Sequence, residues 1–237
     1  MQIKKGMMKT KTTLESIVLL FTAIIITGCS LVFNDIWHAA ENDDVNRIKE
    51  ILAEGGDIHE IRKGSQITPL HYAAMGGASN AVSFLLAHGA DINHTDNVGK
   101  TALHAATTHN LLVFEELIKN GADVNAKDKN GYTPLHCIVL YQDSAHSCEV
   151  LLKNGAKVDA RDNNGRTALW YAARHYRSLA VAEVLLKYGA SVHAKANCGK
   201  TPIEILGKGI AGSSTINIIR YSVKAKKLSK LFKKYDF

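Results

Sequence analysis

A short motif returns along this chain at a nearly constant interval, and this constrains the fold more than any other feature. Thr-Pro-Leu-His occupies residues 68–71 and 133–136, and related tetrads begin at Thr101, Thr167 and Thr201. The five threonines are separated by 33, 32, 34 and 34 residues, and all three prolines of the chain directly follow one of them. A period of this length predicts stacked copies of one small unit.

Within each copy, the order of residue types predicts two short helices and a turn. The threonine hydroxyl can cap a helix, and proline fits the first helical position, where no N–H is needed. A second helix ends in paired aliphatic residues such as Leu85-Leu86, and a glycine follows where the backbone needs a positive φ. A glycine-containing turn then precedes the next threonine and projects as a finger. Helices this short persist only when neighbouring units stack.

These landmarks resemble the ankyrin repeat over residues 34–219. The resemblance implies an all-α solenoid of about six helix-turn-helix units with projecting β-turn fingers, the first and last units serving as caps. The expected units are residues 34–64, 65–97, 98–129, 130–163, 164–197 and 198–219. In the fourth unit, Leu135 and Leu151 are 16 residues apart, against 15 for the equivalent pair in the second unit. That extra residue predicts wider helix spacing or a longer loop between the helices.

The net charge of +7 is concentrated at the two ends of the chain. Residues 1–28 carry a net +3 and residues 220–237 a net +6, whereas residues 29–219 carry a net −2. This distribution argues against nucleic acid as a partner of the repeats, because the positive charge lies outside residues 29–219. Residues 220–237 predict a basic C-terminal capping helix or tail, and contact with anionic lipid head groups is the alternative role.

The first 28 residues predict a signal peptide. Lysines precede an apolar run over residues 17–27, which is too short to span a bilayer as a helix. Ile26-Thr27-Gly28-Cys29 resembles a bacterial lipobox, which implies lipidation at Cys29 and a short tether over residues 29–33. It also implies a lipid-anchored protein of the bacterial cell envelope that faces the periplasm, with the outer membrane favoured by Ser30. An ordinary cleaved signal and an uncleaved short anchor are the alternatives.

The histidines and cysteines favour structural roles. His71, His104 and His136 share one phase of the repeat, and units stacked about 8–10 Å apart hold them too far apart to share a metal ion. The resemblance implies that each one hydrogen-bonds locally and supports the helix cap and the turn. Cys137 and Cys148 are expected to be core thiols and Cys198 to be exposed, and no metal is expected.

No arrangement of residues predicts catalysis. The sequence contains no Gly-x-Ser-x-Gly, no Cys/His pair in a known catalytic context and no phosphate-binding loop. Asp96, Asp128 and Asp162 recur at the repeat period and are interpreted as turn residues. We therefore expect a non-catalytic protein without a cofactor and without a small-molecule substrate.

The resemblance places partner binding on the concave side, at the fingertips and at outward positions of the first helices. The finger positions are Asn97, Val98, Lys100, Lys129, Asn130, Tyr132, Asn163, Arg166 and Lys200, and the helix positions are Met75, Thr108, His109, Leu140, Tyr141, Arg174 and His175. Tyr132, Tyr141, Arg166, Arg174 and His175 are expected to contribute most, because Tyr and Arg dominate interface energetics. The sequence thus predicts a protein–protein interaction scaffold. The alternative is an inhibitor, immunity-type or protective protein that binds one envelope toxin or enzyme.

Overall fold

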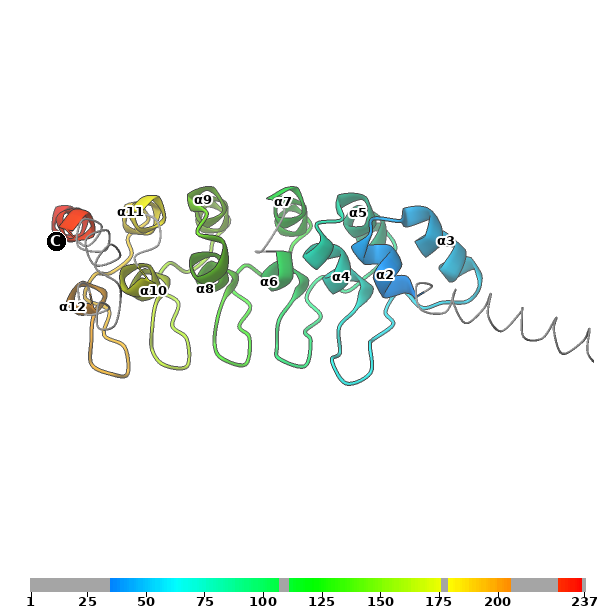
Figure 1. The fold of residues 1–237 in the computed structure, drawn as a ribbon, viewed down its shortest axis with the longest axis horizontal. Helices are drawn as coiled ribbons and strands as arrows, with labels where there is room; N and C mark the ends of the chain where they lie inside the picture. The colour runs from blue at the N-terminus through cyan, green and yellow to red at the C-terminus, as the bar shows by residue number, and fades with distance from the viewer. Residues whose placement is uncertain (1–34, 107–110, 176–178, 206–225, 236–237) are drawn as a thin grey trace, which may run out of the picture.

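The computed structural model describes residues 35–106, 111–175, 179–205 and 226–235, and the helices in these ranges form two parallel rows (Figure 1). The inner row contains α2 (Ile36–Glu41), α4 (Pro69–Gly76), α6 (Ala102–Ala106), α8 (Pro134–Cys137) with the π-helix η1 (Ile138–Gln142), α10 (Ala168–His175) and α12 (Pro202–Ile205). The outer row contains α3 (Val45–Ala53), α5 (Ser79–Ala87), α7 (Leu111–Lys119), α9 (Ala145–Lys153), α11 (Leu179–Lys187) and a last helical stretch, 226–234. Within the described ranges there is no strand, so the predicted all-α solenoid is confirmed.

Long loops extend from the inner row, on the side away from the outer row, and form the fingers (Figure 1). Asp96, Asp128 and Asp162 build the turns as predicted. In each case one carboxylate oxygen accepts hydrogen bonds of 2.8–2.9 Å from the backbone N–H groups two and four residues further on. Neighbouring fingers are joined by backbone hydrogen bonds of 2.8–2.9 Å, for example from Lys129 N–H to the Val98 carbonyl. The fingers therefore form a connected row.

Gly131 shows how closely these fingers approach one another. Its φ is +78°, a conformation that other residues adopt only with strain. A Cβ atom at this position would lie 2.6 Å from the side-chain oxygen of Asn163 and 2.7 Å from its backbone nitrogen. The glycine is needed both for the turn and for the contact with the next finger.

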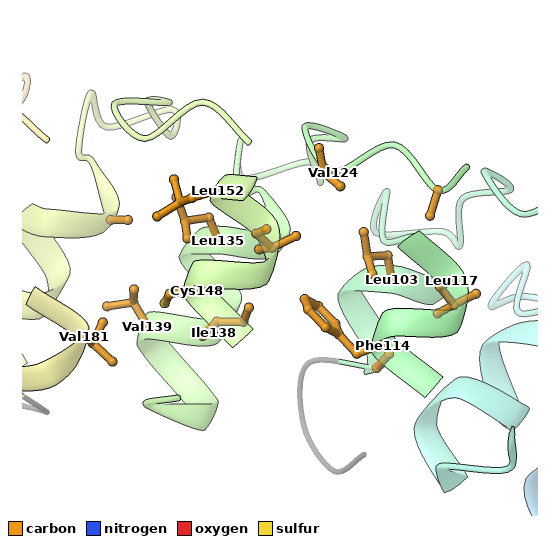
Figure 2. Packing of buried hydrophobic residues seen from close by; sticks show 14 of the residues in the cluster. Leu103, Phe114, Leu117, Val124, Leu135, Ile138, Val139, Cys148, Leu152 and Val181 are labelled. Atoms are coloured by element: carbon orange, nitrogen blue, oxygen red, sulfur yellow. The ribbon is translucent and has the colours of Figure 1, made fainter. Parts of the chain in front are cut away.

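One continuous hydrophobic core runs between the two rows (Figure 2). Leu103, Phe114 and Leu117 of the third unit and Leu135 and Ile138 of the fourth belong to it, and each is at most 1% exposed. Cys137 and Cys148 are buried free thiols, as predicted, and burial raises the pKa of each to about 12. Cys198 is free and exposed, also as predicted. At the C-terminal end, Leu228 and Phe232 of the 226–234 helix are buried in the same core.

The extra residue of the fourth unit lies inside its first helix. Two residues separate η1 from α9, the same number that separates α4 from α5, so the prediction of a longer loop is wrong. Instead α8 continues into the π-helix η1, whose wider turn takes up one more residue than an α-helix. The helix then stops at Asp143, which has a left-handed φ of +56°.

Several predictions concern residues outside the described ranges. The signal peptide (1–28), Cys29 and its tether, Thr108, His109 and the predicted end of the sixth unit at residue 219 all lie there. The described helix 226–234 falls within the predicted basic tail, 220–237. None of the helices that the structure describes is long and apolar enough to cross a membrane.

Candidate protein-binding surface

Three buried histidines tie successive units together. His71, His104 and His136 each sit three residues after the capping threonine, whose hydroxyl lies 2.8–2.9 Å from Nδ1. On the other side of each ring, Nε2 lies 3.0–3.2 Å from a backbone carbonyl of the next finger. These carbonyls belong to Lys100, Tyr132 and Arg166, respectively. The predicted local role is confirmed, and each histidine also forms a link between units that the repeat pattern did not indicate.

The same contacts define which nitrogen of each neutral ring carries the hydrogen. A carbonyl oxygen can only accept, so Nε2 carries the hydrogen and Nδ1 accepts from the threonine hydroxyl. Burial lowers the pKa of all three histidines, against a smaller opposing effect of the carbonyl hydrogen bonds. Burial therefore favours neutral imidazoles in the folded protein, with Nε2 donating to the next finger. Among the described residues, no group of three or more His, Cys, Asp or Glu side chains is arranged to hold a metal ion.

A hollow of about 260 Å³ lies between the inner helices and the fingers of the second to fourth units. Its apolar walls are formed by Ile67, Met75, Val98, Ala105, Cys137 and Tyr141. Lys100, Asp96, His71 and His104 complete the lining. Met75, Val98 and Tyr141 are 37%, 44% and 57% exposed, so apolar surface here remains in contact with water. We call this feature the apolar hollow.

The position of the apolar hollow follows from residue size at one phase of the repeat. Four residues after the capping threonine stand Ala105 in the third unit and Cys137 in the fourth, whereas Tyr72 and Tyr171 occupy this position in the second and fifth units. Small side chains in two adjacent units thus leave a space that a tyrosine would fill.

The π-helix η1 determines which side chain of the fourth unit faces this space. Met75 and Arg174 stand seven residues after their capping threonines and are exposed. Leu140 has the same spacing but is half-buried against the core, and the next residue, Tyr141, is exposed and lines the hollow. Both were predicted to face outward, and the structure confirms exposure for Tyr141 alone.

A second cluster of side chains lies on the fourth and fifth units. The Tyr171 hydroxyl donates to the Asp162 carboxylate at 2.6 Å, lies 3.1 Å from the Tyr132 hydroxyl and accepts from the Arg166 guanidinium at 3.3 Å. Burial, followed by the hydrogen bond to Asp162, raises the pKa of Tyr171, so its proton is retained. The guanidinium carbons of Arg166 and Arg174 lie 4.6 Å and 5.8 Å from the centre of the Trp170 ring. Two cations are thus held beside one aromatic ring.

The remaining predicted partner-binding residues differ in how available they are. The exposed ones are Asn97, Val98, Lys129, Asn130, Tyr141, Asn163, Arg174 and Lys200, and the half-buried ones are Lys100, Tyr132, Leu140 and Arg166. His175 is the last residue of α10, and the described part of the structure includes its backbone but not its side chain. The side-chain amides of Asn97 and Asn163 donate at 2.8 Å to the carbonyls of Gly64 and Lys129 in the preceding fingers. These two asparagines therefore hold the row of fingers together.

Two further residues were not predicted: Ile67 lines the apolar hollow, and the buried Trp170 lies beside Arg166 and Arg174. Ile67 directly precedes a capping threonine, as do the predicted residues Lys100 and Tyr132, so the repeat phase could have identified it. Trp170 stands where other units carry the linking histidine, and its indole Nε1 is buried without a hydrogen-bond partner among the described residues. The fifth unit therefore replaces a link between units with an aromatic platform for two arginines.

Stacked helix pairs with a connected row of fingers define a helical repeat protein. The family model for ankyrin repeats (three copies) matches residues 36–128 and 109–196. This chain therefore belongs to the ankyrin-repeat family, whose repeats serve as protein–protein interaction scaffolds and are typically not catalytic.

Curated relatives match a shorter stretch. Neurogenic locus notch homolog protein 1 of Xenopus tropicalis is 33% identical over 102 residues, and the human protein of that name is 34% identical over 101 residues. Each alignment covers 42% of this chain but only 4% of the relative. The Drosophila melanogaster neurogenic locus Notch protein is 35% identical over 80 residues, or 33% of this chain and 3% of the relative. The chain thus spans a small part of these relatives.

Proposed function

We propose that this protein is a scaffold that binds another protein through its concave surface, with the apolar hollow as the principal contact. The observation that carries this proposal is the exposure of Met75, Val98 and Tyr141 around one space. Covering apolar surface stabilises a complex by about 25 cal/mol per Å² removed from water, before the costs of association. A partner that inserts an apolar side chain would gain this free energy.

The cations around the apolar hollow favour a partner segment that carries acidic residues. Lys100 Nζ lies 6.0 Å from the centre of the Tyr141 ring at the edge of the hollow. Further along the same face, Arg166 and Arg174 lie beside Trp170. The carboxylates of Asp96, Asp128 and Asp162 accept hydrogen bonds from the finger turns, so they are held within the fingers. Arginine beside an aromatic ring suits recognition of a carboxylate, which it can bind through two hydrogen bonds.

Site-specific photocrosslinking in intact cells tests this proposal. A benzophenone-bearing amino acid at position 141 should capture a protein, because this side chain lines the hollow and is 57% exposed. The matched control places the same group at Leu112, which is 65% exposed on α7 of the outer row. Adding Met75→Asp to the probe at 141 should reduce the adduct several-fold, since a carboxylate in the hollow opposes an apolar side chain.

The identity of the captured proteins separates the two forms of the proposal. One partner, bound at nanomolar affinity, would favour the inhibitor or protective protein, whereas several loosely bound partners would favour the general scaffold. Identical adducts from positions 141 and 112, or adducts with lipid alone, would contradict binding at the hollow.

We further propose that Cys29 is lipidated and holds the protein in a bacterial cell envelope, facing the periplasm, with the outer membrane favoured. The support is the order of lysines, a short apolar run and Ile26-Thr27-Gly28-Cys29 in the sequence. Two or three acyl chains give stable membrane attachment where a single chain does not.

Metabolic labelling with an alkyne fatty acid checks the lipid anchor. The wild-type chain should incorporate the label and sediment with membranes, and Cys29→Ser should lose the label, because the serine hydroxyl cannot replace the acylated thiol. Cys198→Ser is the matched control, since that thiol is exposed and lies on a finger. Equal labelling of wild type and Cys29→Ser would refute lipidation at this residue.

A further inference from the structure

The last described helix, 226–234, has two faces of opposite character. Leu228 and Phe232 are 2% and 0% exposed, and Leu231 and Tyr235 pack against the same core. Its five lysines are all exposed: Lys226, Lys227, Lys230, Lys233 and Lys234. With 100° between successive residues, the lysines occupy an arc of about 120° opposite the apolar arc. The apolar face fixes the helix to the repeats and directs the five charges outward. We call this the lysine face.

The lysine face differs from the rest of the outer row. On α9, Glu149 lies 3.3 Å from Lys153 and also 3.9 Å from Lys187 of α11, so acidic and basic side chains are mixed there. Residues 226–234 contain no acidic residue. None of the five lysines forms an ion pair with another described residue. Lysines three and four positions apart repel one another and weaken the helix. Stability of the helix therefore does not account for this composition.

We propose that the lysine face binds the surface of a membrane that contains anionic phospholipids. An ammonium group on a flexible chain attracts a phosphate without demanding a fixed geometry, which suits lipid head groups that move laterally. A nucleic-acid surface commonly adds arginine forks and exposed aromatic rings for base stacking, and the lysine face contains neither. The aromatic residues of the stretch, Phe232 and Tyr235, instead pack against the core.

This face is separate from the proposed protein-binding surface. The 226–234 helix ends the outer row, whereas the fingers extend from the opposite side of the inner row (Figure 1). Attachment through the lysine face would leave the apolar hollow open. The two proposals can therefore fail independently of each other.

Sedimentation with vesicles tests the proposal on the full chain. Vesicles are made of phosphatidylcholine with or without about 30% phosphatidylglycerol, and residues before the repeats are kept in every variant. Each lysine near an anionic surface strengthens binding by about fivefold, so the anionic lipid should increase binding by at least about a hundredfold. Substituting all five lysines of the lysine face by glutamine should remove most of this increase. The increase should also fall steeply at high salt.

A matched control removes the same charge elsewhere. It carries glutamine at five other exposed lysines, Lys49, Lys63, Lys119, Lys157 and Lys195. This variant should keep most of the increase, and circular dichroism should show the same helix content for all three proteins. Equal responses of the two variants to phosphatidylglycerol would overturn the proposal. So would binding of a 20-nucleotide single strand or of polyglutamate through the same five lysines, at the same salt, as tightly as the vesicles.

Discussion

Replacing Leu135 by alanine should lower the free energy of unfolding by about 2–5 kcal/mol, a large part of what a domain of this size possesses. Leu135 is 1% exposed in α8, in the middle of the array, and belongs to the continuous core. Its loss leaves a cavity between units whose helices are only four to nine residues long. Because such helices persist by stacking, the defect weakens the units on both sides.

Urea denaturation followed by circular dichroism measures this effect. Leu112→Ala is the matched control, since it makes the same chemical change at a side chain that is 65% exposed. A surface change of this kind is expected to alter stability by less than about 0.5 kcal/mol. If both substitutions shifted the denaturation midpoint equally, the side chain of Leu135 would not be part of a cooperative core.

Acidification should destabilise the array through His71, His104 and His136. Their pKa values lie below 6.5 in the folded protein because the rings are buried, so the unfolded chain takes up protons first as the pH falls. Stability is therefore fully present above about pH 6.5 and is lost below it. Each histidine that stays neutral in the folded state contributes a slope of up to about 1.4 kcal/mol per pH unit, and three could reach about 4 kcal/mol per unit.

Urea denaturation at several values between pH 7.5 and 5 checks the sign and the source of this effect. His136→Gln should be less stable than wild type at pH 7.5 but should have a shallower slope below pH 6.5. Leu112→Ala provides the control, because it removes no titrating group from an exposed position, and it should keep the slope of the wild type. Constant stability of the wild type between pH 7 and 5 would be incompatible with neutral, buried imidazoles linking the units.

The repeat phase was enough to predict the architecture, because the residues that define it act locally. A threonine caps the helix that follows it, a proline begins that helix, and an aspartate organises its own turn. The π-helix η1 could not be predicted in this way. The sequence shows one extra residue between Leu135 and Leu151, but a loop and a helix can both accommodate it. The choice depends on how the buried side chains of Ile138 and Val139 pack against neighbouring units.

Prediction of the binding surface was also limited, because it depends on contacts between units that the repeat phase does not show. The repeat phase alone placed both Leu140 and Tyr141 at outward positions. In the structure Leu140 packs against the core and Tyr141 is exposed to solvent. Phase also could not show that Asn97 and Asn163 are engaged with the preceding fingers, because their partners belong to other units. The lysine face was visible in the sequence as apolar residues at helical spacing. Its outward direction depends on Leu228 and Phe232 entering the core.

The apolar hollow takes its walls from three successive units, and this joins recognition to folding. Separating any two of these units would take the hollow apart, so an occupant binds only while all three remain stacked. By thermodynamic linkage, an occupant at a hundred times its dissociation constant adds about 2.7 kcal/mol to the stability of the stacked form. A partner bound there would hold the three units together. After its release, these units would resist heat and proteolysis less than they do in the complex.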